Sequence, residues 1–207
     1  MFVSDIVELD KKRSKVFLDG EFAFVLYKGE LRDYDIKLGQ SLSESNYADI
    51  TEVLLPKRCK LRAMNLLQKK DYTEKQLRDK LAEGLYPSEI LDDAIHYVKA
   101  YHYLDDERYA RDYVTYHMPM RSRNRIVQDL TGKGIDKAIF MPIVEEVYAE
   151  EGEDAELEQI RKLLIKKHYD PDNMDYNEKQ KIMTALMRKG YGISMIKRAM
   201  GADDYFD

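Results

Sequence analysis

The 207-residue chain has little of several features that define whole classes of protein. Its single cysteine, Cys59, excludes an internal disulfide framework and a multi-cysteine metal site, and it fits a reducing cytoplasm. Five prolines and ten glycines are too few for a collagenous or disordered composition. No apolar run approaches the roughly 18 residues of a membrane span, and the first residues lack the pattern of a signal peptide. We therefore expect a cytoplasmic chain with no membrane partner.

Net positive charge is absent as well. The formal net charge is −5, with 35% charged and 44% hydrophobic residues. The apolar fraction is enough to bury real cores, and the length allows one or two domains. Because proteins that bind nucleic acid strongly are usually basic, any such binding must come from a local patch.

Motifs of catalytic and metal sites are also missing. No phosphate-binding glycine-rich loop or nucleophile motif occurs, and the four histidines form no ligand spacing with carboxylates or Cys59. Asp105 and Asp106 fit the start of a helix better than a metal pair. The acidic stretch from Asp170 to Glu178 lacks the glycine of a calcium loop. We expect no catalytic residues, no metal, no cofactor and no enzyme activity.

The N-terminal segment has the pattern of a small antiparallel β-meander. Strands are predicted over 2–9, 15–18 and 21–27, and Asp19-Gly20 between the last two is a strong hairpin signal. A helix capped by Ser43 or Ser45 should cover one face of this sheet, and Pro56 fits the first turn of the next helix. We interpret the segment as a structural or docking module.

After Pro56 the apolar residues recur every three and four positions, which predicts helices throughout. One pattern returns three times: two apolar residues of a short middle helix precede a glycine, at Gly84, Gly134 and Gly190, where the helix should stop in the left-handed conformation. Thr73 and Gln76 form a capping box at the first middle helix. The variable spacing between copies indicates duplicated bundles instead of a tight solenoid.

The predicted fold is therefore mainly α, with three tandem three-helix bundle repeats that form an elongated, curved monomer behind the β-meander. The boundaries follow from the repeats. Residues 1–42 form the sheet module, 43–104 a connecting helix and repeat 1, 105–151 repeat 2, and 152–207 repeat 3.

Two stretches, the linker between repeats 1 and 2 and the middle of repeat 2, carry a resemblance to a known family. Residues 102–110 read His-Tyr-Leu-Asp-Asp-Glu-Arg-Tyr-Ala, and residues 125–135 read Arg-Ile-Val-Gln-Asp-Leu-Thr-Gly-Lys-Gly-Ile. Together they resemble the signature of the RecX family, Gly-Tyr-Leu-(Asn/Asp)-Asp-x-x-(Phe/Tyr)-Ala followed by Ile-x-x-x-Leu-x-x-Lys-Gly-Ile. The resemblance covers 57–150 in sequence and 153–200 in layout. His102 stands where the family commonly has glycine, and residues 69–73 replace a more arginine-rich stretch.

The resemblance implies a regulator of the RecA recombinase in DNA repair, homologous recombination and the SOS response. Such proteins lie in the groove of the RecA filament on single-stranded DNA and lower its recombinase, ATPase and co-protease activities. Contact of this chain with the single strand would be weak or indirect. Two other classes stay open: a helical DNA-binding transcription or nucleoid factor, and a helical-repeat adaptor for another protein.

Basic residues of repeats 1 and 2 are the candidate contacts for the partner or for DNA. Three arginines at the turn into a short helix form a local anion-seeking patch. The full set comprises Arg121, Arg123, Arg125, Lys133, Arg108, Arg111, Lys69, Lys70, Arg78 and Lys80. Tyrosines alternate with these cations and could stack bases, but their four-residue spacing, at Tyr97, Tyr101, Tyr109, Tyr113 and Tyr116, favours core packing.

Overall fold

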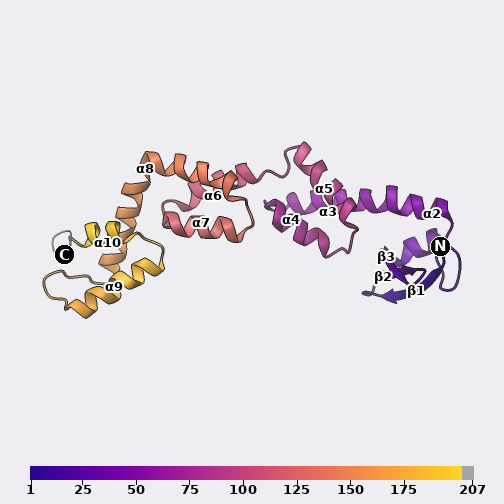
Figure 1. Cartoon of the computed structure of the whole chain (residues 1–207), viewed down its shortest axis with the longest axis horizontal. Coiled ribbons are helices and arrows are strands. Elements are labelled where there is room, and N and C mark those ends of the chain that lie inside the picture. The colour runs from indigo at the N-terminus through magenta and orange to yellow at the C-terminus, as the bar shows by residue number, and fades with distance from the viewer. Residues whose placement is uncertain (202–207) are drawn as a thin grey trace. The chain divides into compact units, whose positions relative to one another are not determined.

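The computed structural model describes residues 1–201, apart from the side chains of residues 150–152. It consists of two compact units, of which the first ends at Asp105 and the second begins at Asp106 (Figure 1). The first unit holds the sheet and repeat 1, and the second holds repeats 2 and 3.

The sheet is the predicted antiparallel meander of three strands in the order β1-β2-β3. Asp19 and Gly20 join the last two strands, and both have positive φ, as a type I′ hairpin turn requires. The pairing of β2 with β3 shifts register between Val16 and Phe17. The strands are β1 (Val3–Glu8), β2 (Arg13–Leu18) and β3 (Glu21–Tyr27), followed by the short helix α1 (Lys28–Asp33).

One uninterrupted helical stretch leads from the sheet into repeat 1. It consists of α2 (Glu44–Ala48), the π-helical segment η1 (Asp49–Leu54) and α3 (Leu55–Leu67). Ser43 caps its start by accepting a hydrogen bond from the Asn46 amide. Pro56 lies in the first turn of α3, as predicted, but no loop precedes it. The Leu55 amide instead bonds the Ile50 carbonyl, and this wider turn carries the helix past a residue that has no N–H.

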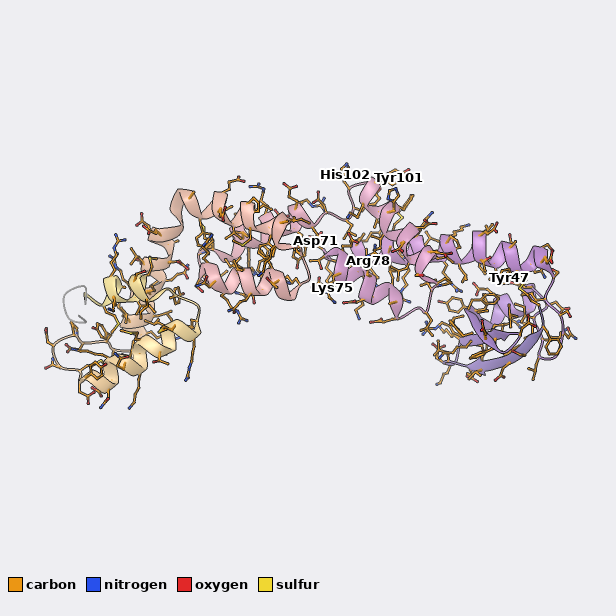
Figure 2. All side chains as sticks on the ribbon, in the orientation of Figure 1. Tyr47, Asp71, Lys75, Arg78, Tyr101 and His102 are labelled. Atoms are coloured by element: carbon orange, nitrogen blue, oxygen red, sulfur yellow. The ribbon has the colours of Figure 1, made fainter. Side chains whose placement is uncertain are left out.

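The sheet shares one hydrophobic core with repeat 1. Val16, Phe24 and Leu26 of the sheet belong to the same buried cluster as Leu55 and Leu81. Tyr47 of α2 covers this face, its ring 6.2 Å from that of Phe24 (Figure 2). Residues 1–42 are therefore packed as part of the first unit. Repeat 1 itself is made of α3, α4 (Glu74–Ala82) and α5 (Ser88–Ala100).

Repeats 2 and 3 each have a core of their own and share one helix. The core of repeat 2 surrounds Phe140, and that of repeat 3 surrounds Ile160. The helix α8 (Lys137–Lys166) supplies the third helix of repeat 2 and the first of repeat 3, so the expected boundary between 151 and 152 falls within it. The remaining helices are α6 (Asp106–His117), α7 (Arg123–Gly132), α9 (Tyr176–Arg188) and α10 (Ile193–Met200).

Several helix termini follow the sequence signals, and one predicted glycine stop does not. Thr73 and Gln76 form the predicted capping box, and Gly134 and Gly190 have the expected positive φ. The expectation is wrong for Gly84, because Leu85 takes the left-handed conformation there with φ 54°. Gly84 serves close packing instead: a Cβ on it would lie 2.3 Å from the ring of Tyr86.

Candidate functional site

The start of α7 is held against the end of α9 by hydrogen bonds. Ser122, buried at 1% exposure, caps α7 by accepting from the Arg125 amide and donates to the Lys189 carbonyl over 2.7 Å. Asn124 donates to the Gly190 carbonyl over 3.0 Å. These bonds satisfy backbone groups of both repeats, so they fix repeat 2 against repeat 3 at this point.

A buried glutamine adds a second bridge between the two repeats. The amide nitrogen of Gln159 on α8 donates to the Met118 carbonyl over 2.6 Å, and its oxygen accepts from the Tyr191 hydroxyl over 2.8 Å. Burial raises the pKa of Tyr191 to about 12, so this hydroxyl stays a donor at physiological pH. A buried network in which both the nitrogen and the oxygen of Gln159 are hydrogen-bonded gives the junction a defined geometry.

Beside this junction lies a groove of about 610 Å³ whose charged lining is entirely cationic. We call it the α8–α9 groove. The residues that line it include no carboxylate within the described part of the chain. The cations come from the turn before α7, from α7, α8 and the end of α9: Arg121, Arg125, Lys162, Arg188 and Lys189.

Arg121 and Arg125 share a single carboxylate. Asp129, whose side chain is 15% exposed, lies 2.6 Å from the Arg121 guanidinium and 3.1 Å from that of Arg125. Arg121 is half-buried and also donates to the Tyr113 hydroxyl. These contacts give it a structural role. One carboxylate between two guanidinium groups leaves positive charge at the groove.

Arg123 does not join the other two arginines. Its backbone amide donates to Glu156 over 2.6 Å, and its side chain lies 3.9 Å from Glu145, in a separate hollow. Burial raises the pKa of Glu156. The hydrogen bond from the Arg123 amide and the charge of Arg123 act in the opposite direction but do not cancel this effect. The three arginines that are close in sequence therefore do not share one face, because successive helical positions project in different directions.

The other predicted residues of repeat 2 lie away from the groove. Arg111 binds Glu146 in a bidentate pair of 2.7 and 2.9 Å, and this pair raises the pKa of Arg111 and lowers that of Glu146. Lys133 lies over the ring of Tyr113 at 5.0 Å. Arg108 is exposed on α6.

Two of the four predicted cations of repeat 1, Arg78 and Lys80, face acidic neighbours. Arg78 on α4 pairs with Glu74 and Asp92, and Lys80 lies 2.6 Å from Glu83 (Figure 2). Such exposed pairs neutralise one another, which makes α4 a weak surface for an anion. Lys70 lies over the ring of Tyr72 at 4.5 Å, and Lys69 lines a different groove.

The tyrosines divide into two groups. The prediction of core packing is correct for Tyr97, Tyr109 and Tyr113, which pack against the cores of their repeats. It is wrong for Tyr101 and Tyr116, which are 59% and 69% exposed. Tyr101 directly follows the last residue of α5, Ala100, at the end of that helix (Figure 2).

Sequence reasoning missed the contribution of repeat 3. Arg188 and Lys189 have no carboxylate within ion-pair distance among the residues whose side chains are described, and both are exposed. A signal was present, because two adjacent cations directly before a helix-ending glycine lie at the negative end of the helix dipole. Lys162 is 72% exposed and 3.5 Å from Glu158.

Among the side chains that the structure describes, no group of three or more His, Cys, Asp or Glu is placed to hold a metal ion. No described helix combines the length and apolar character needed to cross a membrane.

The arrangement defines a class: a sheet followed by three helical domains, with a cationic groove between two of them. Three RecX family models match in order along the chain: the first three-helix domain over 59–97, the second over 105–140 and the third over 154–200. The regulatory protein RecX of Caldanaerobacter subterraneus subsp. tengcongensis is 31% identical over 97% of this chain and 98% of its own length. The chain belongs to the RecX family of regulatory proteins, which are not enzymes.

Another relative and two solved structures are also similar to this chain. The regulatory protein RecX of Finegoldia magna is 30% identical over 94% of this chain and 97% of its own. A crystal structure of regulatory protein RecX matches the fold with a TM-score of 0.64 at 24% identity, covering 95% of this chain and 98% of that one. RecX from Lactobacillus salivarius matches with a TM-score of 0.62 at 22% identity over 73% of this chain and 98% of that one.

Proposed function

We propose that the chain binds the RecA filament on single-stranded DNA in the cytoplasm and inhibits its ATPase, recombinase and co-protease activities. The observation that carries this proposal is membership of the RecX family along the whole chain, with all three family domains in order. In this proposal the chain acts by binding its partner and not by catalysis.

The α8–α9 groove is the contact surface that the charges favour. A chain of net charge −5 is repelled by a polyanion unless its cations gather on one surface, because separated charges are screened beyond about 8–10 Å. The groove gathers such cations from two repeats, and Arg188 and Lys189 there are exposed and available for an anion. Acidic side chains of the filament or phosphates of the strand would both satisfy them.

The direct experiment follows ATP hydrolysis by RecA assembled on single-stranded DNA while the purified chain is added. The proposal expects hydrolysis to fall as the chain approaches stoichiometric amounts relative to RecA. No effect at that concentration, together with tight sequence-specific binding of a duplex, would assign the chain to the transcription-factor class. No effect and no DNA binding would favour an adaptor for another protein.

A further inference from the structure

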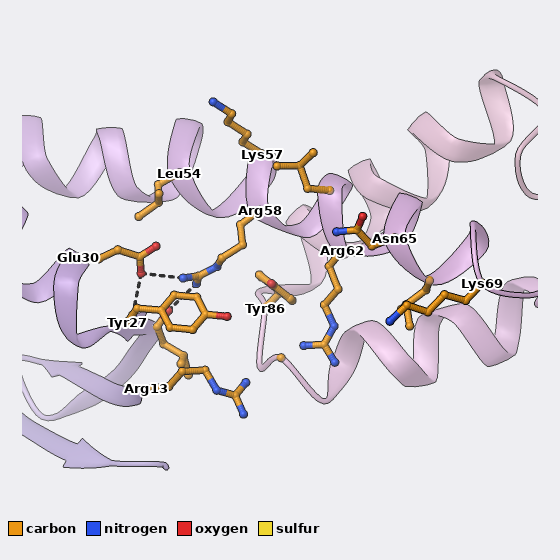
Figure 3. Close-up of a pocket in the computed structure, with 14 residues that line it drawn as sticks. Arg13, Tyr27, Glu30, Leu54, Lys57, Arg58, Arg62, Asn65, Lys69 and Tyr86 are labelled. Atoms are coloured by element: carbon orange, nitrogen blue, oxygen red, sulfur yellow. Dashed lines mark hydrogen bonds and ion pairs between the residues drawn. The ribbon is translucent and has the colours of Figure 1, made fainter. Parts of the chain in front are cut away.

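A second cation-lined groove of about 560 Å³ lies within the first unit, between the sheet and repeat 1 (Figure 3). We call it the sheet groove. Five lysines and arginines line it against one carboxylate, Glu30. The sheet that borders this groove belongs to the most acidic third of the sequence. Neither the net charge nor the local composition therefore predicts a cationic groove here.

Arg58 organises the inner wall of the sheet groove. Its guanidinium donates to Glu30 over 2.8 Å and to the Val25 carbonyl over 2.6 Å. It also lies over the rings of Tyr27 and Tyr86, at 5.2 and 5.7 Å from their centres. Glu30 is thereby neutralised, and sheet and helix are tied together before any ligand arrives.

Three other cations converge across the opening. In Figure 3 the guanidinium groups of Arg13 and Arg62 point toward one another, and the amine of Lys69 points toward Arg62. Arg13 is paired with Asp10 and Arg62 lies 3.5 Å from Glu83, but Lys69 has no carboxylate within ion-pair distance among the described side chains. Even with both rim acids counted, cations remain in excess.

The sheet groove and the α8–α9 groove occupy corresponding places in their repeats. Each is bounded by the first helix of a repeat, α3 or α8, and by the segment that follows its middle helix, which contributes Tyr86 or Tyr191. Each is closed by the module that precedes the repeat, the sheet in one case and the start of α7 in the other. The same construction thus produces a cationic groove twice.

We propose that the sheet groove binds the backbone of single-stranded DNA directly, without a partner protein. Phosphates would lie against Arg13, Arg62 and Lys69. The apolar part of the wall offers surface to the faces of bases, since Leu61 is 52% exposed there. A positively charged groove with apolar and aromatic surface is the usual construction of a sequence-tolerant single-strand site.

The repeated construction favours a strand over an acidic peptide. A nucleic acid presents the same phosphate at every nucleotide, so one ligand chemistry satisfies both grooves. A peptide would need two separate acidic segments of matching sequence. The proposal concerns the chain alone, so its outcome is independent of any effect on RecA.

The test measures binding of a fluorescein-labelled oligo(dT) by anisotropy at several salt concentrations, without RecA. The triple variant Arg13→Gln, Arg62→Gln and Lys69→Gln removes the converging cations. We expect roughly tenfold weaker binding at low salt, and a salt dependence whose slope falls by about two units, because each lost phosphate contact on a single strand is worth about 0.7.

A control variant removes the same charge elsewhere: Lys11→Gln, Lys37→Gln and Lys166→Gln, all at exposed positions outside both grooves. We expect this control variant to show the same salt dependence of oligonucleotide binding as the parent chain. Lys69→Gln alone gives a variant whose folding is not at risk, and its slope should fall by about 0.7. Equal slopes for the parent and Lys69→Gln, or displacement of the oligonucleotide by poly-glutamate at equal charge concentration, would overturn the proposal.

Discussion

Two properties of glycine are needed at position 190. Its φ of +92° lies in the region that side chains disfavour, and a Cβ there would lie 2.5 Å from the Ser122 hydroxyl oxygen. The carbonyls of Lys189 and Gly190 both accept hydrogen bonds from the start of α7. The junction between repeats 2 and 3 therefore depends on the backbone being able to approach this closely.

We expect Gly190→Ala to lower the free energy of unfolding by about 2 kcal/mol or more, from backbone strain and the forced separation from Ser122. Urea denaturation of the full chain measures this. Gly132→Ala is the matched control, because a Cβ there meets nothing within 4 Å and its φ is not positive. A loss no larger than that of the control would show that the contact at Ser122 is not needed.

His102 adopts a left-handed backbone conformation, with φ 56°, at the end of α5. The RecX signature commonly has glycine here, and the structure supplies the reason. We expect His102→Gly to stabilise the chain by about 0.5–1 kcal/mol, because relief of strain exceeds the added entropy of the unfolded chain. Thermal unfolding should show a higher midpoint for His102→Gly.

His96→Gly is the control for that substitution. His96 is exposed within α5, where the backbone is helical, so glycine should cost about 1 kcal/mol instead. Replacing histidine by glycine is therefore expected to raise the free energy of unfolding at position 102 and to lower it at position 96. Destabilisation of both variants would contradict the prediction.

At the scale of elements, most starts and stops of helices and strands could be predicted, and most contacts between elements could not. Asp19-Gly20 and the capping box of Thr73 act through neighbours a few residues away, so their patterns are visible in the sequence. The continuity of α8 could not be predicted, because Gly152 lies within it and glycine is the residue that commonly ends a helix. The α8–α9 groove joins residues as distant as Arg121 and Lys189, which only tertiary packing brings together.

Glu156 links the start of α7 to α8 and predicts a pH effect. Burial raises its pKa in the folded chain, so between its ordinary and raised pKa the folded state binds more protons than the unfolded state. The charged form therefore costs stability, and this cost appears as pH rises through the raised pKa. Glu156→Gln keeps an oxygen for the Arg123 amide and carries no charge.

We expect the stability of Glu156→Gln relative to the parent to increase as pH rises from about 4.5 and then to level off. Urea denaturation between pH 4 and 8 measures the difference. A difference that shrinks with rising pH would show that the charge of Glu156 stabilises the junction.

At the scale of the whole molecule, the chain combines a net charge of −5 with two grooves whose charged lining residues are mostly cations. Repulsion by the overall charge and attraction at the grooves together restrict where a polyanion can dock. The first groove lies in the unit that ends at Asp105 and the second in the unit that follows. The elongated, curved body expected from the repeats stays a prediction.

The sheet is packed into the core of the first unit and also supplies Arg13 to the sheet groove. Deleting residues 1–42 would uncover the buried face of α2 and α3 and remove Arg13 from the sheet groove. Such a deletion therefore cannot separate a structural role from a binding role. Substitutions of exposed groove residues, which leave the shared core intact, make that separation.

The central claim is that the chain binds the RecA filament through the α8–α9 groove. The measurement is the equilibrium affinity of the fluorescently labelled chain for a RecA filament preassembled on single-stranded DNA, compared between the parent and Arg188→Glu with Lys189→Glu. Lys11→Glu with Lys37→Glu is the control of equal charge change. We predict at least tenfold weaker binding for the groove variant, beyond any loss in the control. Equal affinities of the groove variant and the control would contradict the account.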